Sequence, residues 1–413
     1  MKKYIIIMLL LTATIILNAE LTQRGFVRTH FGTLIEDGEY AIMQNTFDWR
    51  LDYGKGDVSL YVNPVFNYSG LNKNLDISLR QAYFDIFFDN FDLRIGKQQI
   101  IWGKADGVFI TDIVSPLNLT EFLLPDFDEI RTGVNAVKIN YYLGNNTIEA
   151  IWIPQFTPTV MPTDGSIWNA MPEFPAPATF DWSKSTINPS LENSEFFLKY
   201  TALTSAIDFE VMGGYTWDDT PSMHVEKQFT MNPETMQPML TGLNITPEHH
   251  RLYIGGASFS TEIKGVILRG EGAFYNGKHF QTEDPLATDA LIEKDYLHYL
   301  VGADFNIGNI KMSTQFIQQS ILDYDEGITN SEFENTMTFM ARYDMFRETV
   351  HLELFSYIGL TNEDALIRPK ISYDFDDSFN IQLGSNIFVG ETDGRFGQYQ
   401  DNSMLYLKLK YNF

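Results

Sequence analysis

Residues 405–413 read Leu-Tyr-Leu-Lys-Leu-Lys-Tyr-Asn-Phe, and this stretch decides the fold class. Apolar or aromatic side chains at Leu405, Leu407, Leu409, Tyr411 and Phe413 alternate with tyrosine, lysine and asparagine. Successive side chains of a β-strand point to opposite faces, so this alternation predicts a strand with one apolar and one polar face. The pattern recurs along the chain, for example at 309–317 and 379–389, and helical periodicity is scarce. The sequence therefore predicts an all-β protein.

The connections between the expected strands alternate in length. The strand pattern fits residues 22–34, 39–52, 56–68, 76–88, 91–102, 133–143, 146–157, 193–202, 205–218, 249–260, 262–275, 295–306, 309–320, 333–344, 347–358, 366–376, 379–390 and 402–413. Every second connection is a tight turn, whereas the others include the long segments 103–132, 158–192, 219–248 and 276–294. Short periplasmic turns and long extracellular loops are typical of a transmembrane antiparallel β-barrel of the bacterial outer membrane. Only a closed sheet satisfies its backbone hydrogen bonds in hydrocarbon, so we expect one barrel of about 18 strands, with 16 possible because pattern alone fixes boundaries imprecisely.

Composition and charge exclude several classes of protein. The 413 residues include 29 Lys and Arg, 54 Asp and Glu, and no cysteine, which gives a formal net charge of −25. A disulfide scaffold, a zinc site with cysteine ligands and a thiol enzyme are excluded, and the acidic balance argues against a nucleic-acid partner. The N-terminus combines Lys2 and Lys3 with an apolar run over 4–17 and a cleavage point after Ala19. Residues 1–19 are therefore expected to be a signal peptide and residues 20–413 the barrel.

Two stretches carry a resemblance to known proteins. The last strand resembles the terminal signal strand of Gram-negative outer-membrane barrels, which implies that the barrel-assembly machinery reads Leu405, Leu407, Leu409, Tyr411 and Phe413. Residues 93–106 read Leu-Arg-Ile-Gly-Lys-Gln-Gln-Ile-Ile-Trp-Gly-Lys-Ala-Asp. This stretch resembles a family of outer-membrane barrels of unassigned function, in which an Arg-x-Gly-x-Gln strand leads into a Trp-Gly-Lys-Ala-Asp loop. It is more distantly similar to porins with an Arg-x-Gly strand before an inward loop. The resemblance covers 80–160 and the last strand, and it implies a fold and a membrane but no substrate.

The segment 103–132 is unusually apolar for an outside loop. Side chains such as Phe109, Phe122 and Phe127 are unfavourable in water, so we expect the loop to fold into the lumen and narrow it. The alternative is a compact cap packed on the rim or on another subunit. The candidate pore and constriction residues belong to this loop and to the strands that lead to it: Arg80, Arg94, Gln98, Trp102, Lys104, Asp106, Asp112, Asp126, Asp128 and Arg131.

Charges on the polar faces of the expected strands belong in the lumen. A charge that faces lipid costs about 2–4 kcal/mol near the membrane midplane. Most of these charges are expected to form ion pairs that stiffen the wall. Arg80 and Arg94, on adjacent strands that lead to segment 103–132, are the best candidates for a transverse field that selects solutes.

These observations predict an outer-membrane channel for passive passage of small solutes. The alternatives are a gated conduit for hydrophobic or amphipathic molecules, and a surface adhesin or structural barrel that displays loops 158–192 and 219–248. An enzyme is not expected, because none of the seven histidines belongs to a catalytic motif. His249 and His250 begin a strand and would point to opposite faces, so no metal and no cofactor are expected. The expected partners are outer-membrane lipid, the barrel-assembly machinery, small solutes and, for an oligomer, further copies of the chain.

Overall fold

The computed structural model describes residues 20–170, 174–284, 286–287 and 289–413. The predicted signal peptide, residues 1–19, lies outside the described residues. In the described part of the chain, no helix has the length and apolar character needed to cross a membrane.

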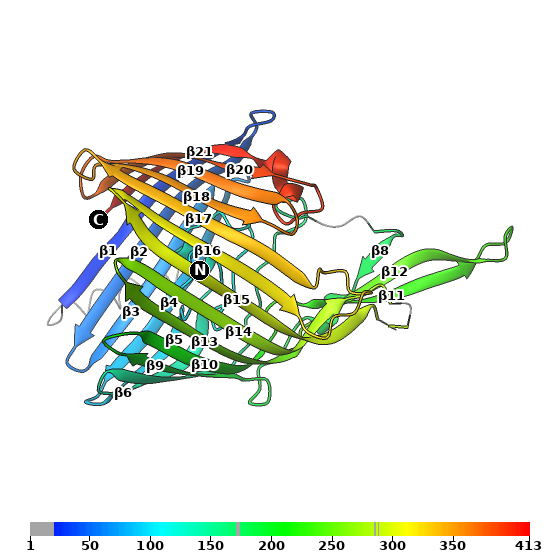
Figure 1. Cartoon of the computed structure of the whole chain (residues 1–413), viewed down its shortest axis with the longest axis horizontal. Helices are drawn as coiled ribbons and strands as arrows, with labels where there is room; N and C mark the ends of the chain where they lie inside the picture. The colour runs from blue at the N-terminus through cyan, green and yellow to red at the C-terminus, as the bar shows by residue number, and fades with distance from the viewer. Residues whose placement is uncertain (1–19, 171–173, 285, 288) are drawn as a thin grey trace, which may run out of the picture.

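Eighteen antiparallel strands form one closed barrel, as the sequence predicts, and the alternative of 16 strands is wrong. The last strand pairs with the first from Phe26 opposite Asn412 to Leu34 opposite Met404, which closes the sheet. Figure 1 shows the strands tilted around the barrel axis. The barrel strands are β1 (Glu20–Leu34), β2 (Tyr40–Lys55), β3 (Val58–Ser69), β4 (Asn74–Phe87), β5 (Phe91–Gln98), β6 (Val134–Leu143), β7 (Asn146–Ile153), β9 (Glu195–Leu203), β10 (Asp208–Trp217), β13 (Arg251–Ile263), β14 (Val266–Gln281), β15 (Leu291–Ile307), β16 (Ile310–Ile321), β17 (Phe333–Met345), β18 (Val350–Gly359), β19 (Asp364–Asp374), β20 (Phe379–Val389) and β21 (Met404–Asn412).

Tight turns join the strands at one end of the barrel. Gly56, Gly144 and Gly308 occupy three of these turns with φ of +59°, +63° and +59°. Glycine adopts this left-handed backbone without the steric cost that a Cβ atom brings, and such turns match the twist of antiparallel hairpins. The tight turns predicted from the sequence are therefore present, except that the turn expected at Thr261 lies at Lys264 and Gly265, because β13 continues to Ile263. The long connections lie at the opposite end.

The strands place apolar side chains outside and polar side chains inside. On β1, Val27 and Phe31 are exposed on the outer surface, whereas Phe26, Arg28 and His30 are buried. The same alternation leaves Leu405 and Tyr411 of β21 exposed. Lipid covers the outer surface of such a barrel, so the inward charges avoid hydrocarbon.

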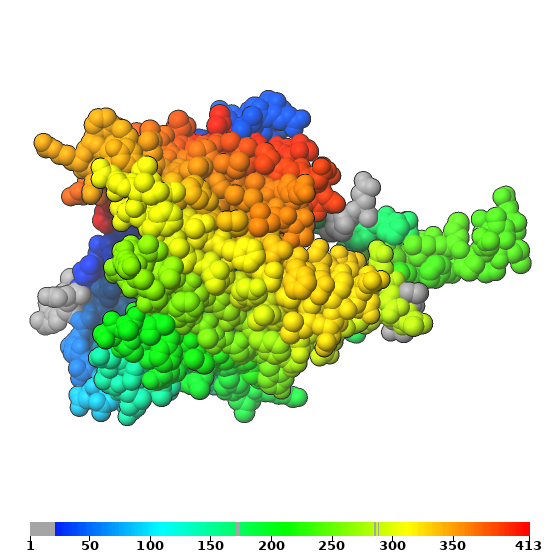
Figure 2. Space-filling view, in the orientation of Figure 1, coloured from blue at the N-terminus to red at the C-terminus, as the bar shows by residue number. Residues whose placement is uncertain are grey.

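A second sheet, which the sequence did not predict as strands, lies outside the barrel. It consists of β8 (Ala178–Phe180), β11 (Ser222–Met231) and β12 (Pro238–Glu248). β12 pairs with β11 in antiparallel and with β8 in parallel register. Figures 1 and 2 show this sheet projecting from the long-loop end. Prolines at 221, 233, 238 and 247 interrupt the alternation of apolar and polar residues in 219–248. Because proline is disfavoured in strand interiors, the sequence predicts a loop there.

Strand β5 ends at Gln98, four residues before the predicted end at Trp102. Beyond it, the backbone bonds to the following segment, since Ile100 N donates to Ser115 Oγ at 2.8 Å. The described chain also contains one short helix, α2 (Phe127–Ile130), and two 3-10 turns, η1 (Trp182–Lys184) and η2 (Gly397–Asn402). Helix α2 lies within the segment 103–132 that follows β5.

Candidate functional site

The segment 103–132 leaves the wall after β5 and contacts strands on other sides of the barrel. Lys104 N donates to Glu271 Oε2 of β14 at 2.9 Å. Asp106 N donates to Gln315 Oε1 of β16 at 3.0 Å, and Gln315 Nε2 donates back to Asp106 O at 2.7 Å. These partners are inward-facing side chains, so the segment lies against the inner wall.

Further along, the same segment contacts β18 and β19. Tyr357 Oη of β18 donates to Gly107 O at 2.7 Å. Gly107 has a φ of +81°, and a Cβ atom there would lie 2.7 Å from Tyr357 Oη, so only glycine permits this approach. Arg368 of β19 donates from Nη1 to Leu123 O at 3.1 Å and from Nη2 to Leu124 O at 2.9 Å. The segment is thereby held at several points across the barrel.

Apolar packing fixes the segment in place. Ile110, with 0% of its surface exposed, packs in a cluster with Leu252, Ile254 and Leu300 of the wall. Phe122 packs in another cluster, where its ring centroid lies 4.7 Å from that of Tyr399. This packing removes Ile110 from water and covers part of Phe122, whereas Phe127 remains 38% exposed.

Four of the predicted residues form buried supports of the segment. Arg131 Nε donates to Asp112 Oδ2 at 2.5 Å, and Trp102 N donates to Asp112 Oδ1 at 3.2 Å. The Trp102 indole, which donates to Glu149, is 2% exposed. Gln98 is fully buried and donates from Nε2 to Ala136 O at 3.1 Å. These contacts suit a structural role at the base of the segment.

Three other predicted residues make separate contacts. Lys104 Nζ lies 3.7 Å from Glu210 Oε1, and Asp106 forms an ion pair with Arg269. Arg94 lies nearer the tight turn after β4, where Nε and Nη2 donate to Asp85 at 2.7 and 3.0 Å. The structure therefore does not bring Arg94 together with the loop charges.

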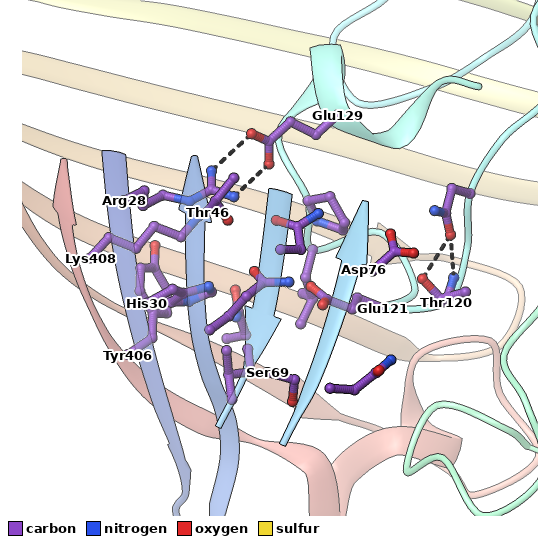
Figure 3. A pocket seen from close by; sticks show the side chains of 18 of the residues that line it. Arg28, His30, Thr46, Ser69, Asp76, Thr120, Glu121, Glu129, Tyr406 and Lys408 are labelled. Carbon is purple, nitrogen blue, oxygen red and sulfur yellow. Dashed lines mark hydrogen bonds and ion pairs between the residues drawn. The ribbon is translucent and has the colours of Figure 1, made fainter. Parts of the chain in front are cut away.

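Several cavities lie between the segment and the wall, and two of them share lining residues. The outer cavity, of about 280 Å³, is lined from the long-loop side by strands β1–β4, β19–β21 and residues 118–129. Figure 3 shows its lining side chains. The inner cavity, of about 340 Å³, lies deeper and is lined by residues that include Asp106, Asp126 and Glu353. Both cavities are lined by Pro125, Arg368, Tyr406 and Lys408, so they adjoin each other at these residues.

Opposite charges face each other in the outer cavity and at its boundary with the inner one. Arg28 of β1 donates from Nη1 and Nη2 to Glu129 of the segment at 3.0 and 2.9 Å. Lys408 Nζ of β21 lies 3.8 Å from Asp126 Oδ1. The cations come from wall strands and the carboxylates from the segment. Such an arrangement sets up an electric field across the space between them.

The remaining predicted residues are Arg80, which lines the outer cavity, and Asp128 of helix α2. Arg80 Nη1 lies 2.5 Å from Asp48 Oδ2, and Arg80 Nη2 lies 3.8 Å from Glu129. Asp128 contributes its backbone oxygen, which accepts from Gln99 Nε2 at 2.9 Å. Sequence reasoning missed Arg28 and His30 as site residues. The alternation of Phe26, Arg28 and His30 on β1 was the available signal.

Comparisons with known proteins agree with this architecture. A family model described as "Protein of unknown function (DUF1302)" matches residues 13–341. No curated protein sequence matches the chain. Among solved structures, Pseudomonas aeruginosa OccK2 (OpdF) in complex with glucuronate has a TM-score of 0.55 at 10% identity, covering 95% of this chain and 98% of that one. P. aeruginosa OccK5 (OpdH) has a TM-score of 0.54 at 9% sequence identity, and the match covers 95% of this chain and 97% of that one. Acinetobacter baumannii OccAB3 has a TM-score of 0.53 at 8% identity, and the match covers 95% of this chain and 99% of that one. At these identities the likeness shows the fold.

Proposed function

This chain belongs to the DUF1302 family of proteins of unknown function, and we propose that it is an outer-membrane channel for passive passage of small polar solutes. The 18-stranded barrel lies in the outer membrane of a Gram-negative-type cell, with lipid around its apolar belt. The likeness to the Occ barrels favours a channel rather than an enzyme. The barrel-assembly machinery is the partner that inserts it.

The meeting of the two cavities is the observation that carries this proposal. A solute that enters from the long-loop end reaches the outer cavity, passes Lys408 and Arg368, and enters the inner cavity. Segment 103–132 narrows the lumen at Pro125 and Asp126, which face these two cations. Polar side chains that line a narrow passage favour polar solutes over apolar ones.

The charges at the narrow point support a preference among solutes. Arg28, Arg368 and Lys408 on the wall face Glu129 and Asp126 on the segment. A solute with a permanent charge or dipole aligns in this field. The fold neighbour OccK2 is described in complex with glucuronate, a small polar molecule, which agrees with this class of solute.

The packing of segment 103–132 argues against the alternative of a hydrophobic conduit. Ile110 of this segment is fully buried in a packed cluster, whereas Leu124 lines the outer cavity and Phe127 the inner one. Most of the side chains that line these two cavities are polar or charged, so the route offers little apolar surface to an apolar solute. The polar route past Lys408 is therefore favoured.

Conductance in planar lipid bilayers tests the proposal. The purified barrel is expected to give stepwise conductance in potassium chloride. Deletion of 108–124 removes the narrowing and is expected to increase the unit conductance. Deletion of 232–237, the turn between β11 and β12 of the projecting hairpin, is the matched control and leaves conductance unchanged. A barrel that inserts but gives no steps, with or without 108–124, refutes the channel.

Surface attachment is a second candidate function, favoured by the projecting sheet. Phe229, Met231 and Met236 are more than half exposed on its hairpin. Exposed apolar side chains far from the barrel mark a contact surface. Deletion of 222–248 would then abolish attachment of cells while solute uptake is kept, whereas loss of uptake with normal attachment removes this role.

A further inference from the structure

The outer cavity has two chemically different sides. Figure 3 shows Arg28 and Lys408 on one side, and Asp76 and Glu121 on the other. Arg28 lies on β1 and Asp76 on β4, with β2 and β3 between them in the sheet. Three strand spacings separate the two strands by about 14 Å, and the side chains that extend into the cavity shorten this gap. Cationic and anionic groups therefore face the same enclosed space from opposite ends.

The cationic side contains buried polar atoms that lack partners. Among the described residues, neither Arg28 Nε nor His30 Nε2 has a hydrogen-bond partner, and these residues are 7% and 8% exposed. Thr46 Oγ1, in the same lining, is also unpartnered, and this residue is 2% exposed. The nearest carboxylate oxygen to Lys408 Nζ is at 3.8 Å, which is too long for a hydrogen bond. Buried polar atoms are almost always paired in proteins, so this group fits an acceptor that a ligand supplies.

The anionic side has unused charge as well. Within the described part of the chain, no ion pair or side-chain hydrogen bond involves the carboxylate of Asp76 or of Glu121. Between the two sides, the lining includes amides and hydroxyls, among them Gln44, Asn67 and Ser69, which donate and accept hydrogen bonds without adding charge. Arg80 of β4 also lines the cavity, and its charge is paired with Asp48. A solute with an ammonium group at one end and a carboxylate at the other matches all three parts.

We propose that the outer cavity is a binding site for small zwitterions of the amino acid and dipeptide class. The carboxylate of the solute binds Arg28 Nε, His30 and Lys408, while the Nη atoms of Arg28 stay bonded to Glu129. The ammonium group of the solute faces Asp76 and Glu121. A simple anion would leave the two carboxylates unpaired, and a simple cation would leave the buried Arg28 Nε unpaired. This inference rests on the proposed function, because the solute reaches the cavity from the long-loop end of the channel.

Three matched probes test the charge requirement on the wild-type barrel. Diglycine carries both charges, N-acetyldiglycine only the carboxylate, and diglycine amide only the ammonium group. Each probe is added to the long-loop side of single channels in a planar bilayer, and its binding constant is taken from current interruptions. Diglycine is expected to bind about tenfold more tightly than either derivative, since each charged contact contributes a factor of this order.

Substitutions on each side then assign the two ends. In Glu121→Gln, diglycine is expected to lose its advantage over N-acetyldiglycine. In Lys408→Gln, it is expected to lose its advantage over diglycine amide. Lys227→Gln, on the projecting hairpin, is the control and keeps both preferences. Equal binding of the three probes to a conducting wild-type channel overturns the zwitterion site and leaves the channel standing, whereas absence of conductance overturns both.

Discussion

Neutralising Lys408 is expected to shift the ion preference of the channel toward cations. Lys408 Nζ lies 3.8 Å from Asp126 Oδ1 where the outer and inner cavities meet. In a water-filled space with a dielectric constant of about 80, two unit charges at this separation interact by about 1 kcal/mol. A permeating anion beside Lys408 gains a similar energy. Loss of the charge in Lys408→Gln therefore lowers the ratio of anion to cation permeability by a factor of about six.

The reversal potential of single channels in a potassium chloride gradient measures this ratio directly. Lys227→Gln removes the same charge from the projecting hairpin and controls for the overall charge of the protein. A reversal potential in Lys408→Gln equal to that of the wild type would refute the reasoning. Equal shifts in both variants would show that net surface charge, and not the narrow point, sets the preference.

Three further predictions concern the segment, the external sheet and the last strand. Ile110→Ala is expected to lower the free energy of unfolding by about 2–5 kcal/mol, because Ile110 is fully buried between segment 103–132 and the wall. The urea midpoint of the detergent-solubilised barrel measures this loss. An unchanged midpoint would contradict the packing. Burial and the nearby His279 and His224 lower the pKa of His250 to about 4 from its ordinary value of 6.5. Neutral His250 contacts His224 of β11, with 3.0 Å between their Nε2 atoms. This contact is complete above pH 6.5 and weakens as pH falls toward 4, so the protection of amides in 222–248, corrected for the intrinsic pH dependence of hydrogen exchange, should fall at pH 5, and less so in His250→Gln. Removal of Phe413, whose ring stacks on Phe47 with centroids 5.8 Å apart, should reduce the amount of protein in the outer membrane on immunoblots, whereas Asn412→Ser should not.

The strands of the barrel could be predicted because their signal is local. Alternation at residues such as Leu405, Leu407 and Leu409 identifies a strand without reference to any other segment. The tight turns followed for the same reason, since glycines such as Gly56 and Gly144 mark them. The projecting sheet was missed because its strands contain prolines and pair with each other outside the barrel.

The charged contacts of segment 103–132 could be predicted only in part because they join distant segments. Arg28 and Glu129, which form one of these ion pairs, are 101 residues apart. The register that places His30 opposite Lys408 arises only when β1 meets β21 and the barrel closes. The sequence places Arg80 and Arg94 alike on adjacent strands that lead to segment 103–132, and no local pattern distinguishes them. In the structure, Arg94 bonds to Asp85 near a tight turn, whereas Arg80 bonds to Asp48.

The hydrogen bonds that hold segment 103–132 to β14, β16, β18 and β19 also brace the barrel mechanically. A cylinder whose wall is one sheet thick flattens easily when the surrounding bilayer is compressed or stretched. Segment 103–132 resists that flattening, because it is hydrogen-bonded to Gln315, Tyr357 and Arg368 on strands far from β5. The width of the aperture, and with it the current through a single pore, should therefore stay constant as membrane tension changes.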